Sequence, residues 1–160
     1  MTALRLYTDG SCHPPGAVGG WAWILVDDHV VASGTGTTPG SSTHQASELT
    51  AAIEGLAHVV ASGVREVTLL SDSKYLVEGM SSNGRTGWAH AAVKREWRTT
   101  RGKPLLNREL WERLLELEGC LAITWRHVRG HRPKKDTSDD ARYNREVDAL
   151  AGEARRGFVV

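Results

Sequence analysis

The feature that most constrains the fold is a change in hydrophobic period between residues 33 and 49. Before this change, three short apolar segments lie at residues 4–8, 21–26 and around 30–33, separated by Gly-rich or acidic turns. Such close spacing is typical of strands that pair as an antiparallel meander. The start of the chain is therefore predicted to form one side of a sheet.

After this change, apolar residues recur at helical spacing from Leu49 to Val60, which predicts a long amphipathic helix. Ser42 and Thr43 are candidates for its N-cap, and Gly63 closes it. The later segments follow the same two periods: a strand over 67–70, a helix over 73–80, a loop over 81–87, a basic helix over 88–97, a helix over 105–117, a strand over 121–125, a polar loop over 129–140 and a final helix around 147–154.

The order of these elements, β-β-β-α-β-α-α-α-β-α, predicts an α/β protein. Strands separated by helices usually pair in parallel through right-handed crossovers. We therefore expect a five-stranded mixed sheet, with three antiparallel strands followed by two parallel ones and helices on both faces. At 160 residues, the chain is long enough to bury one substantial core, and a single domain over 1–160 is expected.

The composition is that of an ordinary globular protein, with 40% apolar and 24% charged residues. No long apolar run or signal-like N-terminus is present, so we expect a cytoplasmic protein without a membrane partner. Cys12 and Cys120 form neither a disulfide framework nor a metal-ligand pattern, which fits a reducing compartment. No apolar stripe is left over, which predicts a monomer without an obligate protein partner.

The net charge of +1 conceals two basic segments. Residues 94–108 contain six cations and one acid, and residues 126–135 contain five cations and no acid. A chain that concentrates cations in this way is suited to binding a polyanion, although a solvated surface explains either segment alone equally well.

Four carboxylates are expected at one edge of the sheet. Asp9 and Asp72 are predicted to end two parallel strands, and the carboxyl ends of such strands are where open α/β sheets place their sites. Glu48 and Asp148 each stand beside the apolar stripe of a helix that packs on the sheet. Taken singly, an acid of this kind is more often a cap, a turn former or a surface charge. Together, at ends expected to converge, they predict a site.

Carboxylates gathered in one place repel each other unless a cation offsets their charge. Mg²⁺ prefers hard oxygen ligands and shares its shell with phosphate oxygens, so a carboxylate site without His/Cys ligand spacing favours Mg²⁺ over zinc. Two such ions, about 3.5–4 Å apart, form the clamp used in phosphodiester cleavage. We therefore expect two Mg²⁺ ions, for which Mn²⁺ can substitute.

Over essentially its whole length, the sequence resembles the ribonuclease HI family. The resemblance rests on the order and spacing of eight segments: YTDGSC (7–12), GGWAWIL (19–25), SELTAAIEGL (47–56), SDSKYL (71–76), WAHAAVKREWRTTRGKP (88–104), ELWERL (109–114), WRHVRGH (125–131) and NREVDALA (144–151). It implies an RNase H-like fold and endonucleolytic hydrolysis of the RNA strand of RNA–DNA hybrids, leaving 5′-phosphate and 3′-hydroxyl ends.

The same resemblance implies a catalytic set of Asp9, Glu48, Asp72, Asp148 and His131. Asp9 would bridge both metal ions, Asp148 would help to hold the ion that activates water, and Glu48 and Asp72 would hold the ion on the leaving-group side. Glu48 would also accept a hydrogen bond from the ribose 2′-hydroxyl, the group that distinguishes RNA from DNA. His131 would serve proton transfer or product release.

Substrate contacts are implied as well. A basic protrusion at about 84–104 would lie along the DNA backbone. The implied substrate-binding residues are Thr43, Gln45, Lys74, Trp88, Lys94, Arg95, Arg98 and Asn144. Trp97 either joins them or pins the protrusion to the body of the protein. Phosphate contacts position a duplex without reading its sequence, so binding should be salt-sensitive and cleavage only weakly sequence-dependent.

The sequence departs from the family pattern in places. The loop HPPGAVGG after Cys12 lacks a substrate-contacting asparagine, His44 and Gln45 stand where two asparagines are common, and Ala92 replaces a tryptophan. The segments before Trp88 and after His131 are extended. Two alternatives to a free-standing enzyme are a hybrid-binding module of the same fold that does not cleave, and a reverse-transcriptase ribonuclease H domain separated from its polymerase.

Overall fold

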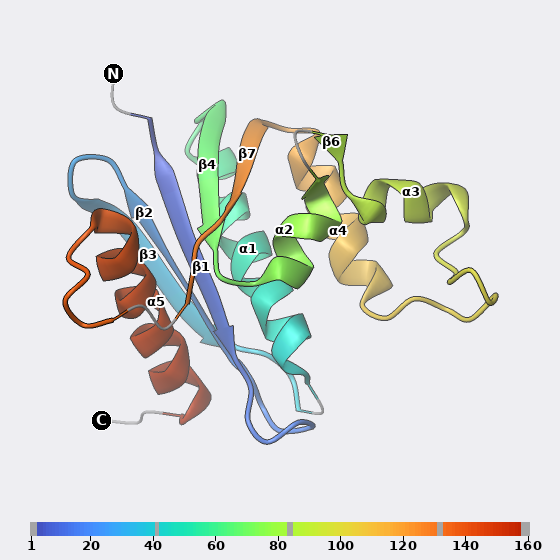
Figure 1. The fold of residues 1–160 in the computed structure, drawn as a ribbon, viewed down its shortest axis with the longest axis horizontal. Coiled ribbons are helices and arrows are strands. Elements are labelled where there is room, and N and C mark those ends of the chain that lie inside the picture. Colours follow the sequence, from blue (N-terminus) through green and yellow to red (C-terminus); the bar gives the residue numbers. More distant parts are fainter. Residues whose placement is uncertain (1–2, 41, 83–84, 131–132, 158–160) are drawn as a thin grey trace.

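The computed structural model describes residues 3–40, 42–82, 85–130 and 133–157 and contains a five-stranded sheet with the strand order β3-β2-β1-β4-β7 (Figure 1). Its strands are β1 Arg5–Ser11, β2 Gly20–Val26, β3 Val30–Thr37, β4 Glu66–Ser71 and β7 Ala122–His127. The β1–β2 and β2–β3 pairs are antiparallel, whereas β1–β4 and β4–β7 are parallel. The mixed sheet predicted from the sequence is confirmed.

Helices cover both faces of this sheet, as predicted (Figure 1). The helices of the described residues are α1 His44–Ala61, α2 Lys74–Met80, α3 Trp88–Lys94, α4 Arg108–Glu118 and α5 Asp139–Arg155. One core lies between the sheet and the layer of α1, α2 and α4, and includes Leu6, Leu56 and Trp111. A second core lies between the sheet and α5, and includes Tyr7 and Val147. Residues 6 and 7 serve opposite cores because successive side chains of a strand point to opposite faces.

Helix α1 begins at the predicted N-cap Thr43, and α2 is capped in the same way. The Thr43 hydroxyl accepts a hydrogen bond from the Ala46 N–H at 3.0 Å, and the Ser73 hydroxyl accepts one from the Leu76 N–H at 3.2 Å. Gly63, with φ +77, follows the C-cap of α1 and takes the left-handed conformation in which glycine is favoured. None of the helices in the described part of the chain has the length and apolar character that a bilayer crossing needs.

Strand β1 is longer than predicted, and Asp9 lies inside it rather than at its end. The parallel pairing with β4 stops at Tyr7 and Leu70, but antiparallel pairing with β2 continues to Ser11. The backbone therefore does not turn at Gly10. A Cβ atom at Gly10 would lie 2.3 Å from the carbonyl carbon of Ser47, so this glycine allows α1 to approach the strand.

Other boundaries differ from the prediction as well, including the start of α5 at Asp139, inside the predicted loop, and the extension of β3 to Thr37. Residues 81–87, predicted as a loop, contain the short strands β5 Ser81–Ser82 and β6 Arg85–Thr86, which pair antiparallel. Helix α3 ends at Lys94 because Glu96 and Trp97 have positive φ angles of 53 and 58. Helix α4 starts only at Arg108, since Asn107 before it is left-handed.

Helix α3 and the segment that follows it project away from the sheet (Figure 1). Trp97 is only 4% exposed and belongs to the α1-side core, so it pins this projection to the body of the protein. Beyond it, Arg98 pairs with Pro104 in an isolated bridge, and the Arg98 guanidinium donates a hydrogen bond to the Gly102 carbonyl at 2.9 Å. The projection is therefore held by internal contacts along its length.

Candidate active site

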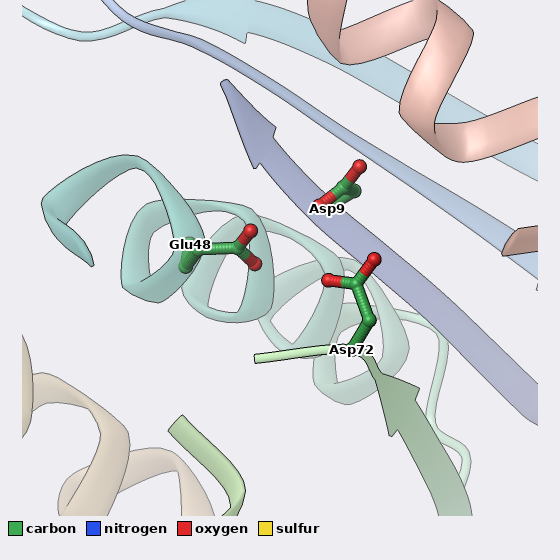
Figure 2. Close-up of side chains that lie close together, drawn as sticks. All are labelled: Asp9, Glu48 and Asp72. Atoms are coloured by element: carbon green, nitrogen blue, oxygen red, sulfur yellow. The ribbon is translucent and has the colours of Figure 1, made fainter. Parts of the chain in front are cut away.

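Three carboxylates from distant parts of the sequence converge at the edge of the sheet (Figure 2). Asp9 lies on β1, Glu48 lies on α1, and Asp72 directly follows β4. One oxygen from each lies within 4.8 Å of the others. Figure 2 shows the Glu48 carboxylate extending from its helix toward Asp9 and Asp72.

The sheet topology brings Asp9 and Asp72 together. β1 and β4 are parallel neighbours, and their last paired residues are Tyr7 and Leu70. Asp9 and Asp72 each lie two positions beyond, on the carboxyl side of the pair. Acids that follow paired parallel strands at equal offsets must emerge at the same edge of the sheet.

Glu48 reaches this edge because α1 crosses β1 at Gly10. Its side chain is almost completely buried, with 2% of the residue exposed. Oε1 lies 3.3 Å from Nε2 of His44, one helical turn earlier. Oε2 is buried and accepts no hydrogen bond from the described residues. A buried carboxylate oxygen without a partner is costly unless something else in the functional protein binds it.

The electrostatics of the cluster favour the binding of a positive charge. Burial raises the pKa of the Asp9 carboxyl, and the neighbouring Glu48, Asp72 and Asp148 carboxyls raise it further. Burial is also the largest cause of the raised pKa of Glu48. The Gly10 N–H donates to Asp9 Oδ1 at 3.0 Å, but one such bond does not offset the repulsion. Hard oxygen donors that destabilise one another when ionised are a fitting ligand set for a divalent cation such as Mg²⁺.

Asp148 joins the cluster from the other side of the sheet. It lies on α5, is exposed, and lines an open pocket of about 790 Å³ together with Asp9, Glu48 and Asp72. His13 and His44 lie at the same pocket. All four acids expected from the sequence therefore border one solvent-filled space.

Gly130, which follows β7, lies against Asp72. A Cβ atom at Gly130 would lie 2.9 Å from Asp72 Oδ2, so only a glycine fits there without displacement. Asn144 of α5 donates from Nδ2 to the same oxygen at 3.4 Å. His131, which the resemblance places in the catalytic set, lies outside the described residues.

The other expected substrate contacts lie in two places. Thr43 and Gln45 are exposed at the start of α1, and Lys74 is exposed at the start of α2. Trp88 lies on the projection, is 37% exposed, and packs edge-on against Trp111 with ring centroids 4.6 Å apart. Lys94, Arg95 and Arg98 are exposed further along the projection.

Two features of the surface were not foreseen from the sequence. Beside the start of α1, a second pocket is lined by Ser42, Ala46, Asn107 and Arg108. The left-handed conformation of Asn107 has a local signal in the sequence, because asparagine adopts this conformation more readily than any residue except glycine. The contact between His44 and Glu48 also has a signal in the sequence, because their i, i+4 spacing places the two side chains on one helix face.

Comparison with known proteins agrees with this geometry. The family model RNase H matches residues 1–156. A ribonuclease H of Geotalea uraniireducens is 39% identical over 139 residues, which cover 86% of this chain and 89% of the relative. Another from Treponema pallidum is 35% identical, covering 96% of this chain and 91% of the relative.

Among solved structures, LC11-RNase H1 in complex with an RNA/DNA hybrid superposes with a TM-score of 0.68. It is 15% identical, and the match covers 96% of this chain and 97% of that one, so it shows the shared fold. The family match and the curated relatives carry the conclusion further: the chain belongs to the ribonuclease H family of hydrolytic nucleases.

Proposed function

We propose that this protein is an endonuclease that hydrolyses the RNA strand of RNA–DNA hybrids and leaves 5′-phosphate and 3′-hydroxyl ends. The observation that carries the proposal is the convergence of Asp9, Glu48 and Asp72, with Asp148, on one open pocket in a member of the ribonuclease H family. A module that only bound hybrid would gain nothing from four carboxylates placed where a polyanion must lie.

The acids are suited to hold two Mg²⁺ ions, for which Mn²⁺ can substitute. Asp9, Glu48 and Asp72 are close enough to share one ion, and Asp148, which lines the same pocket, would help to hold a second. When bound, such ions activate water and stabilise the leaving oxygen in phosphodiester cleavage. In this scheme Asp9 would contribute to both ion sites, as the family resemblance implies.

The remaining residues orient the reacting groups. Glu48 would accept a hydrogen bond from the ribose 2′-hydroxyl, which DNA lacks. Asn144 would hold the Asp72 carboxylate through the contact described above. His131, two residues after Arg129 in the basic β7–α5 connection, would transfer a proton or assist product release.

The DNA strand would lie along the projection, which corresponds to the expected protrusion at about 84–104. Trp88 would contact the sugar–phosphate backbone, with Lys94, Arg95 and Arg98 beside it, while Thr43, Gln45 and Lys74 would contact the hybrid near the acidic cluster. We treat residues 1–160 as one catalytic domain that acts as a monomer. Because Cys12 and Cys120 are both free thiols, we place it in the cytoplasm.

A cleavage assay on matched substrates tests the proposal. The enzyme is incubated with labelled RNA–DNA hybrid, duplex DNA, duplex RNA and each single strand, with Mg²⁺, with Mn²⁺, or with EDTA. The expected result is cutting of the RNA strand of the hybrid alone, and only with metal. Binding of hybrid without cutting would instead identify a non-cleaving module, and cleavage in EDTA would refute the metal site.

A further inference from the structure

His44 is the first residue of α1, and its ring contacts Oε1 of Glu48. Its Nε2 lies 3.3 Å from that oxygen. The two side chains differ sharply in exposure, at 63% for His44 and 3% for Glu48. His44 also lines the pocket that the four acids share. His44 therefore contacts both the open pocket and a buried carboxylate.

The contact is not explained by the stability of the helix. The N-terminus of α1 is already capped by Thr43, whose hydroxyl accepts from the Ala46 N–H. A histidine at the first position adds nothing to this, because the helix dipole disfavours a cation at that end. The position of His44 is better explained by its contact with Glu48 and its place in the lining of the pocket.

The two oxygens of Glu48 have different surroundings. Oε1 faces His44, while Oε2 is buried and has no hydrogen-bond donor among the described residues. An ionised carboxylate only accepts hydrogen bonds, so the matching tautomer of His44 carries its hydrogen on Nε2. A glutamate side chain has several rotatable bonds, and a donor on one oxygen fixes the direction of the other.

Building on the proposed function, we propose that His44 is a positioning residue for Glu48: its Nε2–H holds Oε1 and so presents Oε2 to the cation and to the ribose 2′-hydroxyl. The role is a property of this chain, since His44 stands where the resemblance leads one to expect asparagine. An asparagine side chain is shorter than histidine and would not place its amide as far along the helix toward Glu48.

Two substitutions separate the proposed hydrogen bond from the bulk of the ring. His44→Leu keeps a side chain of similar size and removes the donor, whereas His44→Gln keeps an N–H donor at about the position of Nε2. The exposure of His44 means that both variants should fold, which thermal unfolding in EDTA verifies. His29→Ala is the matched control, because His29 is an exposed histidine in the β2–β3 turn.

The first measurement is Mn²⁺ binding to the enzyme without substrate, by calorimetry at one fixed pH. We expect His44→Leu to bind Mn²⁺ about tenfold more weakly, as is typical when a partner of a metal ligand is lost. His44→Gln should recover most of the affinity, and His29→Ala should match the wild type.

The second measurement is steady-state cleavage of hybrid in saturating Mg²⁺. His44→Leu should lower kcat about tenfold with little change in KM, and His44→Gln should restore it. Unchanged Mn²⁺ affinity and kcat in His44→Leu would overturn the inference, as would an increase in KM alone, which would make His44 a substrate contact. If the wild type fails to cut hybrid, the proposed function fails, while the Mn²⁺ titration still tests the role of His44.

Discussion

At the scale of single residues, the site depends on the carboxylate of Asp9, which is held in a buried position that disfavours its ionised form. Asp9 is 3% exposed, and the side chains of Glu48, Asp72 and Asp148 all act to raise its pKa after burial itself. A protein that needed only a stable strand would place an apolar residue or a glycine here. This electrostatic cost is best explained by a cation-binding site. A positive charge beside Asp9 offsets both the desolvation of its carboxylate and the repulsion from the neighbouring acids.

The raised pKa values of the cluster predict how the free energy of unfolding depends on pH in the absence of metal. Because the folded-state pKa values of Asp9 and Glu48 are raised, the folded protein binds more protons than the unfolded chain. Their contribution to stability is therefore complete below about pH 4, the ordinary carboxyl pKa, and is lost as the pH rises toward the raised values.

Asp9→Asn should remove much of this penalty. In EDTA near neutral pH, we expect the variant to be more stable to urea by about 2 kcal/mol and to lose less stability between acid and neutral pH. Glu54→Gln, an exposed acid on α1, is the control and should change little. A destabilised Asp9→Asn protein in EDTA would show that the buried charge is not the dominant cost.

At the scale of elements, the site is built by close packing of α1 on β1 and by docking of α5 on the opposite face. Gly10 permits the first contact. The second is fixed at the start of α5, where the Tyr7 hydroxyl donates to Asp140 Oδ1 at 2.6 Å and Arg126 pairs with the same carboxylate. Since Tyr7 lies two residues before Asp9 in the same strand, one strand aligns both helices that carry acids.

Gly10→Ala should therefore be costly. The new methyl group would overlap the backbone of Ser47 and push the start of α1, with Glu48, away from Asp9. We expect a loss of about 2–3 kcal/mol in urea unfolding, together with weaker metal binding. Gly40→Ala is a matched control, because nothing lies within 4 Å of its added Cβ. Equal stability of the two variants would mean that α1 can move without cost.

At the scale of the whole molecule, the projection that carries the exposed cations extends away from the sheet whose edge carries the acids (Figure 1). The arrangement lets a duplex be held by its phosphates at one place while the chemistry occurs at another. Trp97 buries itself in the core and so anchors the projection, whereas Trp88 remains partly exposed above Tyr75 and Trp111. Substrate affinity and catalysis should thus be separable by mutation.

The projection can be tested with Lys94→Ala/Arg95→Ala. Both residues are exposed, and Arg98 is left in place because its guanidinium holds the Gly102 carbonyl. Hybrid binding should weaken, and the slope of log K against log salt should become shallower by up to about 2. Arg65→Ala/Arg113→Ala removes the same charge elsewhere and should leave the slope unchanged. Equal slopes for both variants would mean that the DNA lies elsewhere.

The sequence predicted the sheet and its site edge because both follow from chain order. Once β1 and β4 are parallel neighbours, Asp9 and Asp72 must meet. The strand ends were less predictable, since β1 continues to Ser11 only because β2 lies beside it. The β5–β6 hairpin has strands of two residues each, too short to produce a period. The different burial of Trp88 and Trp97 depends on backbone angles that a local pattern does not encode.

The most direct test of the central claim compares the wild type with Asp9→Asn on one labelled RNA–DNA hybrid in Mg²⁺, measuring binding and cleavage in parallel. The account predicts that both proteins bind the hybrid with similar affinity, that the wild type cuts the RNA strand, and that Asp9→Asn does not. Cleavage by Asp9→Asn at the wild-type rate would contradict it, because the chemistry would then not depend on the carboxylate at the centre of the cluster.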